Sequence, residues 1–134
     1  MVCCAMPPNT DFNIGLRDDL GNDLLDPDHQ STYNRGGIRL LNLIDGEYVE
    51  QRNSSSSYPW GYRIRNNSIE ERFEMRIFQG QDNFLIKWSI DDYDTLQIET
   101  TDDGMFLLEI RYNNVVVWDE AMLDNSRYFE VIKE

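Results

Sequence analysis

The sequence predicts an all-β protein: an antiparallel β-sandwich, immunoglobulin-like or related, of roughly nine strands with minor short helical turns. Three observations lead to this fold class. Apolar residues alternate with polar ones, turn-forming residues separate the alternating segments, and two long connections interrupt the pattern. The chain has 134 residues, enough for one domain with its own core. We expect residues 1–11 to form a tether and residues 12–134 to form this single domain.

The alternation begins at Phe12 and is typical of strands with one buried and one solvated face. The expected inward residues are Phe12, Ile14 and Leu16; Phe73, Met75 and Ile77; Phe84, Ile86, Trp88 and Ile90; Leu96 and Ile98; and Phe106, Leu108, Ile110 and Tyr112. The intervening residues, such as Glu74, are expected to face solvent. Residues 38–44 are apolar on both faces, which predicts a central strand, and residues 47–51, 115–118 and 128–132 supply further strands.

Turn-forming residues separate these segments. Asp45-Gly46 and Asn113-Asn114 tolerate the positive φ angles that tight hairpin turns require. The longer connections after residues 17 and 51 favour a sandwich over a barrel, because they suit strands that cross between two sheets. The only helical candidates are residues 22–26, which Pro27 would end, and residues 120–125.

The chain is strongly acidic, with 12 Lys and Arg residues against 25 Asp and Glu residues and a formal net charge of −13. Such a charge repels phosphate backbones and anionic lipid surfaces, so nucleic-acid binding is not expected. With 40% hydrophobic and 12% aromatic residues, the chain is too apolar for a disordered acidic tail. We interpret the charge as the solvated exterior of a folded domain, the alternative being a site for a cation or a basic partner.

Both cysteines, Cys3 and Cys4, lie near the N-terminus. Adjacent cysteines would close a strained ring, so no internal disulfide is expected, and with the single His29 they cannot supply the four ligands of a zinc site. Met1-Val2-Cys3-Cys4 is similar to the end of a bacterial lipobox, with Cys4 as the lipidated residue and Cys3 as the alternative. This interpretation requires a signal peptide ahead of Met1. Otherwise the two are reduced thiols of a cytoplasmic protein.

An acidic loop at residues 18–28 contains the densest set of oxygen ligands. Calcium prefers six to eight oxygens. The calcium candidates are Asp18, Asp19, Asp23 and Asp26. The loop lacks the spacing of helix–loop–helix calcium motifs, however, and its three leucines predict that it folds over the core while its aspartates bond to local backbone groups. No metal or other cofactor is therefore expected.

Three aromatic residues, Tyr58, Trp60 and Tyr62, follow a run of serines. Exposed Tyr and Trp side chains stack on sugar rings or anchor protein partners, so all three are candidates for ligand binding. The alternative for Trp60 is that it packs over the open end of the sandwich. Hydrolysis would need a specific pair of carboxylates across a cleft, and none stands out, so no enzymatic activity is expected.

Two segments, FNIGLRDDLGNDLLDP at residues 12–27 and IRLLNLIDG at residues 38–46, resemble small uncharacterised lipoproteins of Bacteroidetes-type bacteria. In these proteins a first strand leads into a D-x-x-G-x-D-L-L-x-P loop and then into a strand that ends in a polar turn. The resemblance implies a lipid-anchored β-sandwich of the cell envelope, in the outer membrane or facing the periplasm, and it brings no catalytic residues.

These observations predict a noncatalytic module that binds a protein or glycan of the cell envelope through its end loops. It would meet a membrane only through its lipid. The alternatives are a soluble acidic interaction domain without a lipid anchor, and a small carboxylate-based hydrolase.

Overall fold

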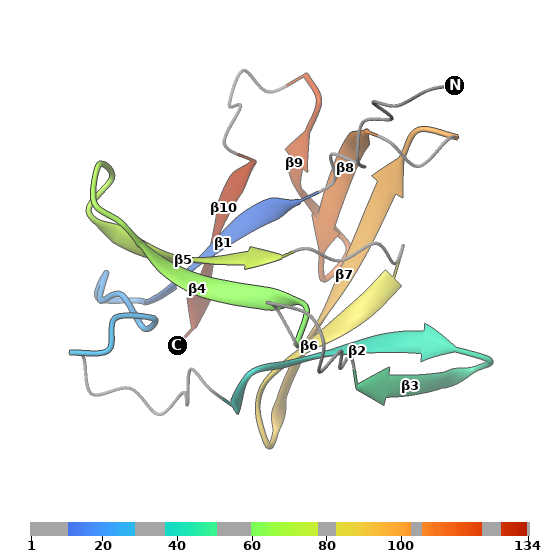
Figure 1. Ribbon diagram of the computed structural model, residues 1–134, viewed down its shortest axis with the longest axis horizontal. Coiled ribbons are helices and arrows are strands. Elements are labelled where there is room, and N and C mark those ends of the chain that lie inside the picture. Colours follow the sequence, from blue (N-terminus) through green and yellow to red (C-terminus); the bar gives the residue numbers. More distant parts are fainter. Residues whose placement is uncertain are drawn as a thin grey trace, which may run out of the picture.

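The computed structural model describes residues 11–28, 37–50, 60–77, 83–102, 106–121 and 127–133, and its regular structure consists of ten strands (Figure 1). The strands are β1 (Phe12–Asp18), β2 (Arg39–Ile44), β3 (Glu47–Glu50), β4 (Tyr62–Asn67), β5 (Arg72–Ile77), β6 (Asn83–Ser89), β7 (Asp92–Thr100), β8 (Leu107–Tyr112), β9 (Val115–Asp119) and β10 (Tyr128–Lys133).

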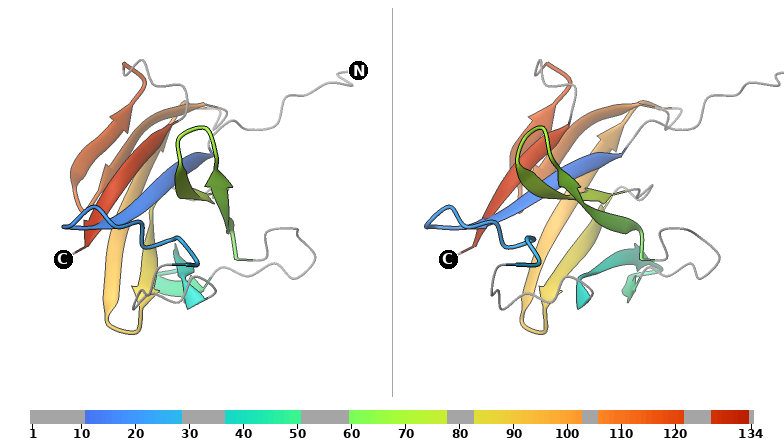
Figure 2. Two further views of the ribbon diagram at one scale, coloured as in Figure 1. Left: turned by 90° about the vertical axis from the view of Figure 1, so that its left-hand side faces the viewer. Right: turned by 60° about the vertical axis from the view of Figure 1, so that its left-hand side comes forward.

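The strands form two sheets packed in layers, so the predicted β-sandwich is confirmed (Figure 2). One sheet has the order β10-β1-β5-β4 and the other the order β3-β2-β6-β7-β8-β9. Neighbouring strands are antiparallel except β1 and β10, which run parallel with Asn13 opposite Tyr128. The chain crosses between the sheets at both long connections that the sequence predicted, from β1 to β2 and from β3 to β4.

Side chains from the facing sides of the two sheets fill the core. On β6 the buried residues are those that the alternation predicted, Phe84, Ile86 and Trp88. On β1 the predicted residues Phe12, Ile14 and Leu16 are buried, but so are Asn13 and Gly15, which were expected on the solvated face. The rings of Phe12 and Phe129 stack with their centres 6.0 Å apart, which adds an aromatic contact to the parallel pairing of β1 with β10. Trp118 at the end of β9 is also buried.

The prediction for the first residues of β8 is wrong. Phe106 is 47% exposed and Leu107 only 5%, whereas the reverse order was expected. The pairing of β7 with β8 shifts register between Glu99 and Thr100, which makes a β-bulge that leaves Leu108 without a directly opposite residue. Because side chains alternate between faces, this extra residue moves the side chains before it to the opposite faces.

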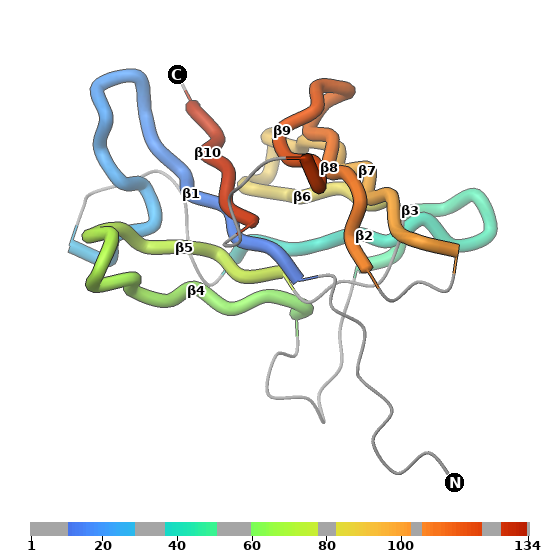
Figure 3. The backbone as a smooth tube through the Cα atoms, turned by 90° about the horizontal axis from the view of Figure 1, so that it is seen from above, coloured from blue at the N-terminus to red at the C-terminus, as the bar shows by residue number. Residues whose placement is uncertain are grey.

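The strands β2 and β3 form a hairpin that projects beyond the body of the sandwich (Figure 3). Asp45 and Gly46 have φ angles of 52° and 83°, which fits the type I′ turn expected of this sequence. β2 lies between β3 and β6 and is therefore an inner strand, as predicted. Its last residues, Leu43 and Ile44, are nevertheless exposed, because the four-stranded sheet ends short of them (Figure 1).

The loop after β1 contains no helical turn at residues 22–26, so that expectation is wrong. Instead, Asp23 forms an isolated antiparallel bridge with Arg17, which folds the loop back along β1. Leu24 and Leu25 are buried in the core as predicted, whereas Leu20 is exposed to solvent. The second helical candidate, at residues 120–125, lies mostly outside the described residues.

Candidate functional site

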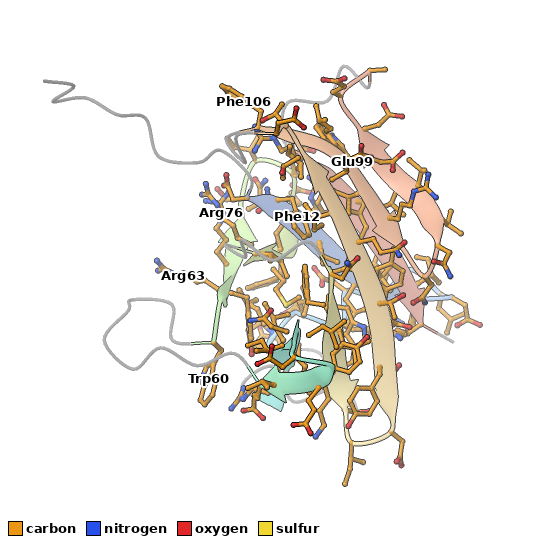
Figure 4. All side chains as sticks on the ribbon, turned by 90° about the vertical axis from the view of Figure 1, so that its right-hand side faces the viewer. Phe12, Trp60, Arg63, Arg76, Glu99 and Phe106 are labelled. Carbon is orange, nitrogen blue, oxygen red and sulfur yellow. The ribbon has the colours of Figure 1, made fainter. Side chains whose placement is uncertain are left out.

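The candidate residues from the sequence fall in different parts of the molecule. Cys3, Cys4 and Tyr58 lie outside the described residues, so their roles stay predictions. Trp60 lies just before β4 and Tyr62 is the first residue of that strand. Figure 4 shows Trp60 close to the β2–β3 hairpin. The acidic loop follows β1 at another place on the molecule.

Trp60 is half-buried and packs against the core. The guanidinium carbon of Arg39, on β2, lies 3.7 Å from the centre of the Trp60 ring, so it covers one face of the indole. Arg39 is itself held by the carboxylate of Glu50 on β3 at 3.3 Å, and it donates a hydrogen bond of 2.8 Å to the carbonyl of Ile38. These contacts fix Trp60 to the base of the hairpin and leave one ring face at most for a ligand.

Tyr62 is part of the core. Its side chain is buried, and its hydroxyl donates a 2.6 Å hydrogen bond to the carbonyl oxygen of Ile38. Burial raises the pKa of the Tyr62 phenol, an effect that the positive charge of Arg39 partly offsets. The ring is therefore not presented on the surface, as a ligand-binding residue at this position would require.

The aspartates of the acidic loop bond to the protein backbone. Asp18 accepts hydrogen bonds of 2.8 and 3.0 Å from two backbone N–H groups of its own turn. Asp23 accepts a 2.8 Å hydrogen bond from the backbone N–H of Phe73 on β5. Across the described ranges, no three His, Cys, Asp or Glu side chains are arranged to hold a metal ion. The structure thus does not gather Asp18, Asp19, Asp23 and Asp26 into one calcium site.

The end of the β2–β3 hairpin exposes four large apolar side chains. Leu43 and Ile44 on β2 and Tyr48 and Val49 on β3 have between 43% and 48% of their surface exposed. We refer to these four residues as the hairpin patch. Leu43 pairs with Tyr48 across the two strands. Since neighbouring residues of a strand point to opposite faces, the hairpin patch has apolar side chains on both faces of the ribbon.

Sequence reasoning missed the hairpin patch, because apolar residues on both faces of a strand were taken as a sign of burial. The sequence did contain an indication that this hairpin is exposed. β3 begins with Glu47 and ends with Glu50, and the turn contains Asp45. Carboxylates this close to the apolar residues indicate that the segment is solvated on at least one side.

A cluster of polar side chains joins the two sheets near the end of β10. We refer to it as the Asp94 cluster, and it consists of Trp88, Asp92, Asp94, Tyr112, Asn113 and Lys133. The Lys133 ammonium lies 2.5 Å from the Asp94 carboxylate and 2.8 Å from that of Asp92. The indole N–H of Trp88 donates to Asp94 at 2.9 Å, and the Tyr112 hydroxyl donates to the same carboxylate.

Electrostatics keep Asp94 ionised within this cluster. Burial acts to raise the pKa of Asp94, but hydrogen bonds from Asn113, Lys133 and Tyr112 outweigh it and hold the pKa below its usual value. Burial, together with the hydrogen bond to Asp94, raises the pKa of the Tyr112 phenol. The ammonium of Lys133 on β10 is thus bonded to two carboxylates of β7, which indicates a structural link between the sheets.

A shallow depression of about 270 Å³ lies on the six-stranded sheet. It is lined by Gln97, Ile98, Glu99, Glu109 and Arg111. Glu99 and Glu109 are opposite each other on β7 and β8, and Arg111 donates to Glu109 at 2.8 Å. In Figure 4, Glu99 lies on the side of the molecule away from Arg63. The depression therefore presents charged groups to solvent, two of which, Glu109 and Arg111, are paired with each other.

Comparison with protein-family models, with curated proteins and with solved structures finds no match. The resemblance to Bacteroidetes-type lipoproteins stays a prediction from the sequence. Within the part of the chain that the structure describes, no helix has the length and apolar character needed to cross a bilayer.

Proposed function

We propose that this protein is a noncatalytic binding module whose partner is another protein, held at the hairpin patch. The observation that carries the proposal is the exposure of Leu43, Ile44, Tyr48 and Val49 at the end of a projecting hairpin. Each face of the hairpin presents two of these side chains, and apolar side chains grouped in this way are costly to leave in water and mark interaction sites. A hairpin with a well-formed type I′ turn presents them in a fixed geometry.

A protein partner fits this surface better than a glycan does. Glycan sites rely on open aromatic faces together with polar groups, whereas the hairpin patch is mainly aliphatic. Trp60, one of the glycan candidates in the sequence, has one ring face covered by Arg39. Glycan binding through Trp60 is the second candidate function, and a glycan screen with the Trp60→Ala variant tests it, since unchanged affinity in the variant rules out this residue.

The charges around the hairpin patch define the partner further. Asp45, Glu47 and Glu50 border the apolar side chains. A partner segment that combines apolar residues with Lys or Arg would match both features. A second copy of the chain would bring two molecules of net charge −13 together, which long-range repulsion opposes.

A site-specific cross-linker tests the proposal directly. A photoreactive phenylalanine derivative replaces Tyr48 in the hairpin patch or, as a matched control, Tyr93 on β7, since the two tyrosines are 48% and 46% exposed. We expect irradiation of cells to yield a discrete adduct with one protein from position 48 only. The purified partner should then bind the Val49→Ser variant about tenfold more weakly than the wild type. Equal adduct patterns at both positions, or unchanged affinity in the variant, would contradict the proposal.

The second part of the proposal is attachment to the cell envelope through a lipid on Cys4. It is supported by the lipobox-like sequence at residues 1–4 and by the eight residue steps from Cys4 to Phe12, which span at most about 29 Å when extended. In cells that express the gene from its native locus, an alkyne-labelled fatty acid should label the wild type and Cys3→Ser but not Cys4→Ser. Labelling that survives in Cys4→Ser and is lost in Cys3→Ser would move the anchor to Cys3. No labelling of the wild type would favour the soluble alternative.

A further inference from the structure

The outer face of the four-stranded sheet is basic although the chain as a whole is acidic. The outward-facing residues of β1, β4, β5 and β10 include the bases Arg17, Arg63, Arg65, Arg72 and Arg76 and the acids Glu74 and Glu130. The arginines alternate with buried residues such as Ile14 and Met75, so they lie on the side away from the core. Figure 4 shows Arg63 and Arg76 on this side of the molecule. We refer to this surface as the arginine face.

The half of the arginine face near β10 is neutralised by its own contacts. Arg72 donates to Glu74 at 2.7 Å, and the Glu74 side chain is only 2% exposed. The Arg72 guanidinium lies 3.4 Å from the centre of the Tyr128 ring, and Arg17 pairs with Glu130 at 2.5 Å. Opposite charges are matched here, which makes this half a rigid support.

The half near β4 has more positive than negative charge. Arg63 lies directly opposite Arg76 in the pairing of β4 with β5, and like charges in this position repel each other. Asp11 bonds to Arg76, and the same carboxylate also lies 3.6 Å from Arg127. Arg65 is exposed and lies opposite Glu74, which is already bonded to Arg72. Among the described residues of this region the formal charge is therefore positive, with Arg63, Arg65, Arg76 and Arg127 against Asp11 and Glu74, and a positive local potential favours an anionic ligand.

The strand β4 is also an edge strand. The sheet order ends at β4, so no described strand pairs with its outer backbone edge. Unpaired N–H and C=O groups on a sheet edge can pair with an added strand. Arg63 and Arg65 stand two residues apart and point to one face, while Ile64 points to the other and packs against the core.

From these two features we propose that β4 accepts an extended segment of a partner protein with acidic residues at alternate positions and apolar residues between them. The carboxylates of such a strand would lie beside Arg63 and Arg65, and its apolar residues would lie on the side of Ile64. Backbone hydrogen bonds would supply affinity and the alternating pattern would supply specificity.

A short peptide suits this surface better than a nucleic acid or a membrane. Long polyanions and flat anionic bilayers would extend beyond the arginine face and meet the acidic remainder of a chain whose net charge is −13. A single added strand stays within about one Debye length of the arginines, where the local positive charge dominates. The proposed edge also belongs to a different sheet from the hairpin patch, so the two are separate sites.

The test uses a fluorescent peptide of alternating valine and glutamate, matched to the six residues of β4. Fluorescence anisotropy measures its binding to the full chain at low salt. We expect the double variant Arg63→Gln/Arg65→Gln to bind about tenfold more weakly than the wild type. The matched controls are Arg111→Gln, an exposed arginine of the other sheet, and Val49→Ser in the hairpin patch, both of which should bind normally.

Two further peptides separate strand addition from simple charge attraction. One has the same composition with its valines and glutamates in separate blocks, and the other is the alternating peptide with N-methyl groups on one backbone edge. We expect both to bind about tenfold more weakly than the alternating peptide. Equal binding of the block peptide, equal binding by the double variant, or no binding of the alternating peptide overturns the proposal. Stronger binding of an oligonucleotide or of anionic vesicles than of the peptide overturns it as well.

Discussion

The phenol ring of Tyr128 lies directly over Gly15, so that a Cβ atom at position 15 would be 1.9 Å from the Tyr128 hydroxyl oxygen. The two residues are on the neighbouring strands β10 and β1. Arg72 stacks on the same ring. Glycine at position 15 is thus required by the close approach of a side chain, which lets the Tyr128 ring lie flat on the arginine face.

We therefore expect Gly15→Ala to destabilise the protein by about 1–3 kcal/mol, because the new methyl group must displace the Tyr128 ring from beneath Arg72. Urea unfolding measures this change. In a Tyr128→Ala background the same substitution should be neutral or slightly stabilising, since alanine restricts the unfolded chain more than glycine does. An equal loss of stability in both backgrounds would mean that the close contact is not the cause.

The lowered pKa of Asp94 predicts that the protein loses stability in acid. The Asp94 pKa is lowered in the folded state, so the stability it contributes is present above its unfolded pKa of about 3.9 and is lost as the pH falls through the folded value. The charged groups around it are Lys133 and Asp92, with hydrogen bonds from Trp88, Tyr112 and Asn113.

Asp94→Asn should remove that part of the acid dependence and lower stability near neutral pH by about 1–3 kcal/mol, because Lys133 and Tyr112 lose a charged acceptor. Urea midpoints measured from pH 7 downward test both effects. Parallel acid profiles for the variant and the wild type would show that Asp94 is not responsible.

The raised pKa of Tyr112 predicts that the protein loses stability at alkaline pH. Burial and the hydrogen bond to Asp94 raise its pKa, so the stability from its protonated form is complete below the unfolded value of about 10 and falls as the pH rises beyond it. Tyr112→Phe should cost about 1 kcal/mol at neutral pH and flatten the alkaline profile. Some slope should remain, because burial also raises the pKa values of Tyr62 and Tyr128. A profile as steep as that of the wild type would contradict this assignment.

Because of the β-bulge at Leu108, a substitution at Leu107 should lower the stability of the protein more than one at Phe106, the reverse of what simple alternation predicts. Leu107→Ala should destabilise the protein by about 2–4 kcal/mol, since it leaves a cavity in the core. Phe106→Ser should change stability by less than about 0.5 kcal/mol, because the ring is already half exposed. Thermal unfolding of the two variants shows which of them loses more stability. A larger loss for Phe106→Ser would support the simple alternation predicted from the sequence.

Sequence reasoning succeeded where the pattern within a strand determines its environment. On β6, alternation identified the buried residues Phe84, Ile86 and Trp88, because a strand between a core and solvent must alternate. On β1 it identified Phe12, Ile14 and Leu16 but missed the burial of Asn13 and Gly15 on the opposite face. Asp45-Gly46 fixed the hairpin turn for a similar local reason, since few residue pairs adopt two positive φ angles. Ile90 broke the pattern because β6 ends one residue earlier, and it is exposed in the turn.

Predictions from the sequence failed where a distant part of the chain determines whether a side chain is buried. Glu74 was expected to face water, yet it is buried and bonded to Arg72, which in turn stacks on Tyr128 of β10. Leu43 and Ile44 were expected to be buried, yet they are exposed because the opposing sheet does not reach them. Neither the reach of one sheet over another nor an ion pair that depends on a distant strand can be read from neighbouring residues.

For the candidate site, too, the sequence identified residue types but not the distant contacts that determine their exposure. The sequence singled out Trp60 and Tyr62 by residue type, but their exposure depends on contacts with Arg39 and Ile38 across a connection between the sheets. The hairpin patch and the arginine face depend on where sheets end, which is a property of the assembled fold.

The parallel pairing of β1 with β10 sets the order in which the domain can be completed. Asn13 on β1 pairs with Tyr128 on β10, near the other end of the chain. During synthesis β1 therefore leaves the ribosome long before β10 has been made. Contacts between residues this far apart in sequence slow folding, because a large loop must close before they form. The four-stranded sheet should therefore be the last part to form, and a nascent chain that stalls before β10 would expose β1 to the quality-control machinery of the cell.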